Sequence, residues 1–136
     1  TVLAGPQATG NLSQQQVDEL LQRINRVMEN TDRIFSPDFS MATLCREVGS
    51  NTKYVSMVIN ATYNKNFKTL LNERRVREAA RQLSAPGPHN SATILQLALS
   101  LGYSSSTSFI IAFKKVMGMT PTVYRRLANE RKEHVG

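Results

Sequence analysis

Residues 94–126 read ILQLALSLGYSSSTSFIIAFKKVMGMTPTVYRR and contain the pattern from which the architecture follows. Apolar side chains recur every three to four residues before and after Gly102, which is the spacing of two amphipathic helices separated by a tight turn. Thr120 followed by Pro121 marks the start of a further helix, because proline is favoured at the first helical position. The stretch therefore predicts a helix, a glycine turn and a second helix, which is the helix-turn-helix arrangement.

The same pattern occurs a second time, earlier in the chain. Apolar and glycine positions of residues 41–49 match those of residues 94–102, and positions of residues 51–70 match those of residues 105–124. Chance agreement is possible between any two amphipathic helices. A shared glycine turn and several matched core positions nevertheless favour a duplicated unit.

The segments around the two repeats also have helical periodicity, and none alternates apolar and polar residues as strands do. Ser13 and Gln16 have the spacing of a capping box before a first amphipathic helix. A loop containing Pro37 is expected after that helix, and SAPGPHNS at residues 84–91 ends a longer helix. We predict an all-α fold of about seven helices, with two helix-turn-helix lobes joined by a long central helix. The predicted parts are a linker (1–12), the N-terminal helix with the first lobe (13–66), the connecting helix (67–84), a loop (85–91), the second lobe (92–128) and a tail (129–136).

Composition and charge narrow the classes of function. The net charge is +7: residues 1–36 hold three basic and four acidic residues, and residues 37–136 hold fourteen basic and six acidic residues. Such clustering favours a polyanionic partner, although a solvated basic surface explains it equally well. The single cysteine excludes a disulfide scaffold and is typical of a reducing cytoplasm. No apolar run approaches the ~20 residues of a membrane span, and the start at Thr1 suggests a domain cut from a longer protein.

The candidate binding surface is the side of each second helix that lies opposite its core residues. At about 100° per residue, the residues expected in the core of the second lobe are Phe109, Ala112, Phe113 and Val116. Those expected on the opposite side are Thr107, Ile111 and Lys114, flanked by Ser106 and Ile110. In the first lobe the corresponding outward residues are Lys53, Met57 and Asn60, flanked by Ser56. Each helix thus presents one apolar residue among polar and basic ones.

An isoleucine that faces outward in so polar a chain needs a partner. One interpretation is van der Waals contact between Ile111 and a thymine methyl group in the major groove, with Met57 in the same role. The other is that Ile111 packs on a neighbouring helix or is an ordinary exposed apolar residue. Ile110 lies on the flank, nearer Met117, and is expected to pack rather than to read bases.

At these residues the chain resembles the C-terminal DNA-binding domain of the AraC/XylS family of bacterial transcriptional regulators. Residues 94–126 follow the family form of an alanine-containing helix, a G-[FY] turn and then F-x-x-x-F-K-K-x-x-G-x-T-P-x-x-Y-R. The stretch NFKTLLNERRVREAARQL at residues 66–83 also fits, and the resemblance covers roughly residues 38–127. The segment at residues 54–67, with the helix before it, is similar to family members attached to large sensor proteins, including membrane-bound ones.

The resemblance implies two lobes joined by a rigid central helix, with both reading helices in successive major-groove turns on one face of the DNA. A central helix of about 27 Å, plus the width of a lobe, is compatible with the ~34 Å of one DNA turn. Carried over position by position, the base-reading residues are Thr52, Lys53, Ser56, Met57 and Asn60 in the first lobe, and Ser106, Thr107, Ile110 and Ile111 in the second. Many members have arginine where Met57 and Ile111 stand, and its absence argues against guanine readout there and favours thymine contact.

Basic residues beside the reading helices are candidates to neutralise DNA phosphates, although each could equally be solvated. They are Lys65, Lys68, Lys114, Lys115, Arg125 and Arg126. Backbone amides at the helix starts after Ser40 and Ser91 are further candidates for phosphate contacts. Arg74 and Glu78 have the i, i+4 spacing of a pair on one helix face.

No residue pattern points to catalysis. His89 and His134 have no second metal ligand at suitable spacing, and Cys45 has no histidine beside it. We predict no enzyme activity, no cofactor and no metal. The predicted function is sequence-specific binding of double-stranded DNA by a cytoplasmic output domain. Its parent chain is expected to carry a sensor part, with a membrane anchor as one option. The alternatives are a helical module that docks on RNA polymerase or on the sensor, and an accessory domain of a nucleic-acid enzyme.

Overall fold

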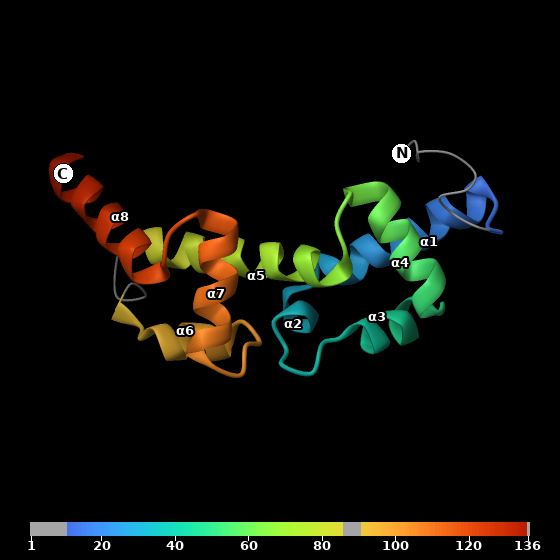
Figure 1. Ribbon diagram of the computed structural model, residues 1–136, viewed down its shortest axis with the longest axis horizontal. Coiled ribbons are helices and arrows are strands. Elements are labelled where there is room, and N and C mark those ends of the chain that lie inside the picture. Colours follow the sequence, from blue (N-terminus) through green and yellow to red (C-terminus); the bar gives the residue numbers. More distant parts are fainter. Residues whose placement is uncertain (1–10, 86–90, 136) are drawn as a thin grey trace. The chain divides into compact units, whose positions relative to one another are not determined.

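The structure, a computed structural model, describes residues 11–85 and 91–135, with side chains described to residue 131 in the last helix (Figure 1). These residues form eight α-helices and no strand. The helices are α1 (Gln14–Met28), α2 (Thr31–Ile34), α3 (Met41–Val48), α4 (Thr52–Tyr63), α5 (Phe67–Ser84), α6 (Ile94–Ser100), α7 (Ser106–Met117) and α8 (Pro121–Val135). The predicted all-α fold with two helix-turn-helix motifs is confirmed, with one helix more than expected. No helix in the described residues is long and apolar enough to cross a bilayer.

The chain divides into two compact units, Thr1–Leu71 and Asn72–Gly136, so that the boundary falls within α5. Each unit contains one helix-turn-helix motif, in which a glycine-containing turn separates two helices. The first unit holds α3 and α4, and the second holds α6 and α7.

The first unit is built around α1, which packs on α2, α3 and α4. The capping box is confirmed, because the Ser13 hydroxyl accepts from the Gln16 amide at 3.1 Å and the Gln16 side chain accepts from the Ser13 amide at 2.9 Å. One apolar stripe of α1 meets the apolar faces of the other helices. The buried core residues are Val17, Leu20, Leu21, Ile24, Met28, Ile34, Phe39, Leu44, Cys45, Val48, Val55, Val58, Ile59, Leu70 and Leu71.

The short helix α2 replaces part of the loop that the sequence predicts after α1. Asn30 caps it by accepting a hydrogen bond from the Asp32 amide at 3.1 Å, and Ile34 is buried in the core of the first unit. A four-residue helix is too short to be stable alone. Tertiary burial of Ile34 therefore accounts for its formation. The predicted loop containing Pro37 follows α2, and the helix itself was not predicted.

The second unit has an aromatic core. The ring of Phe109 lies 5.5 Å from that of Tyr103 and 5.8 Å from that of Phe113, which in turn lies 5.5 Å from the ring of Tyr124. These centroid distances are in the favourable range for aromatic pairs, so the chain of rings ties α7 to α8 and to the turn before it. Val116, which the helical angle placed in this core, is 36% exposed, so that prediction was wrong.

The ends of α4 and α7 confirm the duplication at the level of the backbone. Asn64 after α4 has φ of 56° and Gly118 after α7 has φ of 80°, so equivalent positions both end a helix in the left-handed conformation. The turn between α3 and α4 likewise has Gly49 at φ of 70°. Thr120 accepts from the Val123 amide at 3.3 Å, and α8 starts at Pro121 as predicted but continues beyond residue 128, where the sequence placed a tail.

Candidate nucleic-acid interface

The helices α4 and α7 each begin at a capping residue directly after the turn of their motif. The Asn51 side chain accepts from the Tyr54 amide at 2.9 Å, and the Ser105 hydroxyl accepts from the Ser108 amide at 3.1 Å. Their inward sides are sealed in the cores of their units. The buried residues are Val55, Val58 and Ile59 on α4, and Phe109, Ala112 and Phe113 on α7. The opposite side of each helix holds its exposed residues, together with partly buried ones.

On α4 the predicted base-reading residues occupy the outward side. Thr52, Lys53 and Asn60 are exposed, whereas Ser56 and Met57 are partly buried. The Thr52 hydroxyl lies 3.9 Å from the Cys45 sulfur of α3, which is within reach of a weak hydrogen bond. Met57, the apolar residue of this set, is thus less exposed to solvent than Thr52, Lys53 and Asn60.

On α7 the outward side is more apolar. Ile111 is 64% exposed and Thr107 is exposed, while Ser106 and Ile110 are partly buried. This exposure rules out the interpretation that Ile111 is packed against a neighbouring helix. Partial burial of Ile110 agrees with the expected packing role of its side chain.

The predicted phosphate-binding residues fall into two groups. Lys68, Lys114 and Lys115 are exposed, whereas Lys65 is partly buried. Arg126 is exposed, with its Nε 3.9 Å from the Glu130 carboxylate.

Arg125 is partly buried at the start of α8, and its guanidinium donates to the backbone carbonyl of Ala92 at 2.6 Å. This bond joins α8 to the segment before α6. Arg125 thus has a role in the fold of the second unit, and a phosphate contact by its other N–H groups stays a prediction.

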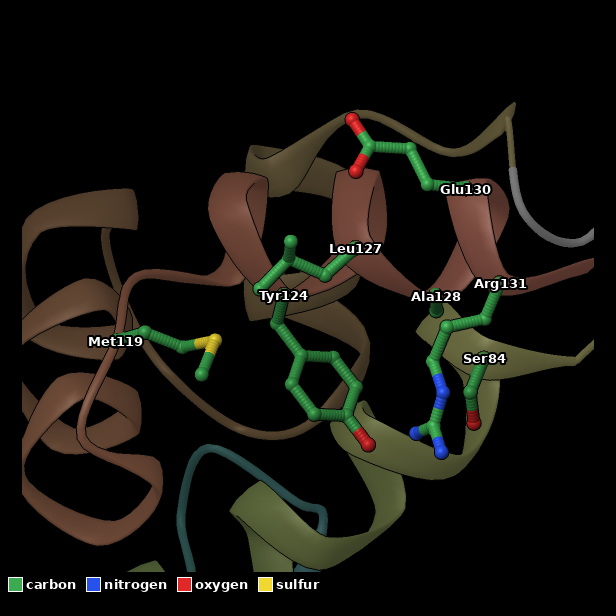
Figure 2. Close-up of a pocket in the computed structure, with 7 residues that line it drawn as sticks. All are labelled: Ser84, Met119, Tyr124, Leu127, Ala128, Glu130 and Arg131. Atoms are coloured by element: carbon green, nitrogen blue, oxygen red, sulfur yellow. The ribbon is translucent and has the colours of Figure 1, made fainter. Parts of the chain in front are cut away.

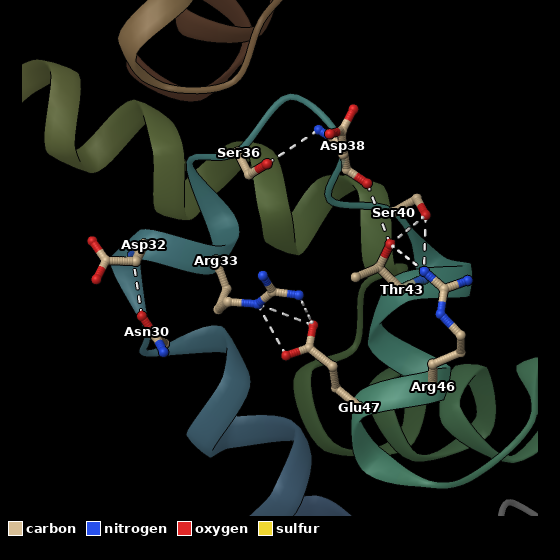
Figure 3. A network of polar contacts seen from close by, with 9 residues as sticks. All are labelled: Asn30, Asp32, Arg33, Ser36, Asp38, Ser40, Thr43, Arg46 and Glu47. Carbon is tan, nitrogen blue, oxygen red and sulfur yellow. Dashed lines mark hydrogen bonds and ion pairs between the residues drawn. The ribbon is translucent and has the colours of Figure 1, made fainter.

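The start of α3 is organised by a polar network (Figure 3). The Ser40 hydroxyl accepts from the Thr43 amide at 3.2 Å, and the Thr43 hydroxyl donates to the Asp38 carbonyl at 3.2 Å. One turn later, Glu47 receives two N–H groups of Arg33, the shorter bond being 2.6 Å. The Ser40 side chain is thus engaged as an N-cap, which fixes the direction of the first amides of α3.

The helix predicted after Ser91 is α6, and its N-cap is Thr93 and not Ser91. Thr93 forms a capping box with Gln96, with bonds of 2.9 and 3.0 Å. Ser91 is exposed and lies two residues before this cap, outside the helix. The amides that the sequence assigned to a helix after Ser91 therefore belong to a helix that begins after Thr93.

A protein family described as a helix-turn-helix domain matches residues 44–127, which is more than half of the chain. The matched range contains α4 and α7 and both turns before them. The chain belongs to the AraC-type helix-turn-helix domains.

Relatives of this AraC-type domain are regulators and DNA-binding domains. An HTH-type transcriptional regulator of Staphylococcus aureus is 29% identical over 103 residues, which are 76% of this chain and 13% of that regulator. The C-terminal domain of AraT, a response regulator from Geobacillus stearothermophilus, matches with a TM-score of 0.67 and 24% identity over 87% of this chain and 88% of that one. The DNA-binding domain of AdpA, solved with a target DNA, matches with a TM-score of 0.65 and 17% identity over 86% and 96%.

Two apolar features of the AraC-type domain were missed by the sequence reading. Leu95 and Leu99, one turn apart on α6, are 49% and 52% exposed. The sequence contains a signal for this exposure. The apolar residues of 94–101 lie on more sides of the helix than one packing face can bury.

The second missed feature is a hollow of about 600 Å³ beside α8 (Figure 2). Tyr124 and Arg131 project from α8 toward the end of α5, where Ser84 lies. The other lining residues are Met119, Leu127, Ala128 and Glu130. Nothing in the sequence pattern places these residues around one hollow, since they come from three separate segments.

Charged groups on α5 serve the fold of the AraC-type domain. Glu78 accepts hydrogen bonds from Arg81 at 2.9 and 2.7 Å and from Gln82 at 2.8 Å, so the expected pair with Arg74 is replaced by one with Arg81. The Arg81 guanidinium lowers the pKa of the Glu78 carboxyl, with a smaller contribution from Gln82. This carboxylate therefore stabilises the folded state above its unfolded pKa, and the contribution is lost as the pH falls through the lowered value.

Arg75 is the buried charged residue of the second unit, at 6% exposure, and the sequence reading missed it. Its guanidinium lies 5.2 Å from the ring centroid of Tyr103, a cation–π distance. The Tyr103 hydroxyl donates to the Asn72 side chain at 2.8 Å. Burial raises the pKa of Tyr103 to about 12, against a smaller opposing effect of Arg75. Among the residues that the structure describes, no group of three potential metal ligands occurs.

Proposed function

We propose that this chain is the sequence-specific, double-stranded DNA-binding part of a longer bacterial transcription regulator, with α4 and α7 as its major-groove helices. The observation that carries the proposal is that each of these helices buries one side in its unit and leaves the opposite side exposed directly after the turn. An exposed helix side of this kind fits the width of the major groove. The AdpA domain, which shares the fold, was solved on a target DNA.

Within this proposal the outward residues of α4 and α7 read bases, and the exposed basic residues beside them position the DNA. The reading set is Thr52, Lys53, Ser56, Met57, Asn60, Ser106, Thr107, Ile110 and Ile111. The phosphate set is Ser40, Lys65, Lys68, Ser91, Lys114, Lys115, Arg125 and Arg126. The proposed role is binding alone, without catalysis, cofactor or metal.

The proposed parent chain has further parts. The Staphylococcus aureus relatives are regulators of which this chain matches 13% of the length, and a sensor part in the remainder is the simplest source of a signal. DNA in a bacterium lies in the cytoplasm, so the DNA-binding part would act there even if its parent were anchored in a membrane. Contact with RNA polymerase is the proposed route to transcription.

The test is binding to duplex DNA, followed by mapping of the bound site. Fluorescence anisotropy with a random duplex pool at low salt should show binding that weakens steeply as salt is added. Hydroxyl-radical footprints of the selected sites should then show two protected patches, about one helical turn apart. A chain that is folded by circular dichroism and binds no duplex pool at low salt would contradict the proposal.

A helical protein-interaction module is the second candidate, and the exposed leucines of α6 favour it. Leu95 and Leu99 present an apolar strip that the core of the second unit does not cover. In that case Leu95→Ser and Leu99→Ser would abolish function in a transcription assay while duplex binding is unchanged. Loss of duplex binding in the same variants would instead assign α6 to support of the DNA-binding surface.

A further inference from the structure

Ile111 is the most exposed large apolar residue in the described part of the chain. Its neighbours one turn before and one turn after on α7, Thr107 and Lys114, are both exposed and polar. The other side of the same turn is closed by Phe109 and Phe113, which are fully buried. Ile111 therefore stands between exposed polar side chains on the outward side of α7, with Ile110 partly buried at its flank.

The outward side of α7 has little capacity to identify a base pair by hydrogen bonds. Its sequence, STSFIIAFKKVM, contains no arginine, asparagine or glutamine, so lysine, which pairs with guanine, is the residue type on it that can make paired hydrogen bonds to a base edge. The Ser108 hydroxyl is used locally, since it donates to the Ser105 carbonyl at 3.1 Å. Ser106 and Thr107 are left as single-point contacts and Lys114 can pair with guanine, so α7 needs another means to recognise a different base.

The apolar group that the major groove offers is the C5 methyl group of thymine. Cytosine and uracil lack this methyl group, whereas 5-methylcytosine carries it at the same position of the ring. An aliphatic side chain detects the methyl group and is indifferent to the amino or carbonyl group beside it.

Building on the proposed function, we infer that α7 recognises a pyrimidine by its C5 methyl group through Ile111. For this helix thymine and 5-methylcytosine are then equivalent, and cytosine and uracil are equivalent to each other. The recognition belongs to α7 and not to α4. On α4, Asn60 is exposed and able to pair with adenine, and the apolar residue Met57 is partly buried.

The experiment uses the full chain and duplexes selected from a random pool. Each thymine of a selected site is replaced in turn by deoxyuridine, and the Kd is measured by fluorescence anisotropy. At one thymine the loss of the methyl group should weaken binding about fourfold, the factor expected for one buried methyl group. Ile111→Ala should weaken binding to the unmodified site by a similar factor and then show no further loss with deoxyuridine at that position.

A second arm tests the chemical equivalence. Replacing the sensitive T·A pair by C·G should weaken wild-type binding, and 5-methylcytosine in place of that cytosine should restore most of the loss. Leu99→Ala is the matched control, because it removes an aliphatic side chain of similar exposure from α6 and should leave the deoxyuridine effect intact. Thermal unfolding by circular dichroism confirms that each variant is folded.

The outcomes separate this inference from the proposed function. Wild type that binds selected sites but is insensitive to deoxyuridine at every position overturns the inference and leaves DNA binding in place. Full deoxyuridine sensitivity in Ile111→Ala overturns it as well, since another residue then contacts the methyl group. Failure to select any duplex overturns the proposed function itself.

Discussion

Truncation of Phe113 and truncation of Ile111, two residues apart on α7, should have different effects on stability and on DNA binding. Phe113 is fully buried, with its ring against those of Phe109 and Tyr124, whereas Ile111 is mostly exposed. Phe113→Ala should therefore destabilise the second unit strongly, and Ile111→Ala should leave its stability nearly unchanged while weakening DNA binding. The contrast tests the division of α7 into a core side and an outward side.

The magnitudes follow from the burial of the two side chains. Truncation of a buried phenylalanine to alanine costs about 3–5 kcal/mol, which includes the cavity that is left. Full burial of an isoleucine contributes about 1.5–3 kcal/mol, and Ile111 hides roughly a third of its surface, so its loss costs about 0.5–1 kcal/mol. Alanine regains about 0.4 kcal/mol through its higher helix propensity. The net change in the free energy of unfolding for Ile111→Ala is thus within about 0.5 kcal/mol.

The assay is urea unfolding followed by circular dichroism at 222 nm, on wild type and both variants under the same conditions. A loss of more than about 1.5 kcal/mol for Ile111→Ala would show that its side chain packs in the fold. That result would refute the assignment of the outward side of α7. A loss below about 1 kcal/mol for Phe113→Ala would refute the aromatic core of the second unit.

Three further outcomes are expected. Lys115→Ala should weaken binding to all duplexes about equally and reduce the slope of log Kd against log salt by about 0.9, whereas Arg26→Ala, which removes an exposed charge from α1, should leave the slope unchanged. Gly49→Ala should lower the free energy of unfolding in urea by about 1–2 kcal/mol. A Cβ at this position would meet no atom within 4 Å, so the whole cost comes from the left-handed φ of 70°. The free energy of unfolding of wild type should fall between pH 10 and pH 12, since the unfolded tyrosine ionises before Tyr103, whose pKa burial raises to about 12. Tyr103→Phe should lack that part of the fall in parallel urea titrations, and an equal fall in both proteins would contradict the burial of the phenol.

The starts of α1 and α8 were predictable because their signals are local, whereas the end of α8 and helix α2 were not predicted. A cap residue bonds to an amide three residues away, so the capping box of Ser13 and Gln16 could be assigned without knowledge of the rest of the chain. The left-handed ends at Asn64 and Gly118 are local in the same way. The outward direction of a side chain on a helix is likewise a matter of angle along the sequence.

The errors occurred where a feature depends on what lies beyond the helix. The angle along α7 placed Val116 toward the core, but no part of the fold fully covers that position in the last turn. Helix α2 exists because Ile34 finds a place in the core around α1. The pairing of Glu78 is a separate error, because Arg81 lies on the same helix and replaces Arg74 as the partner at i, i+3 instead of i, i+4.

By itself the sequence determined the helical class, the duplicated motif and the residues that turn away from each core, since periodicity and capping act over a few residues. The tertiary structure decided how accessible those residues are. It left Ile111 open to solvent while partly covering its equivalent Met57, bound Arg125 to the Ala92 carbonyl and buried Arg75 against Tyr103. Exposure depends on segments far away in the chain, and no local pattern contains that information.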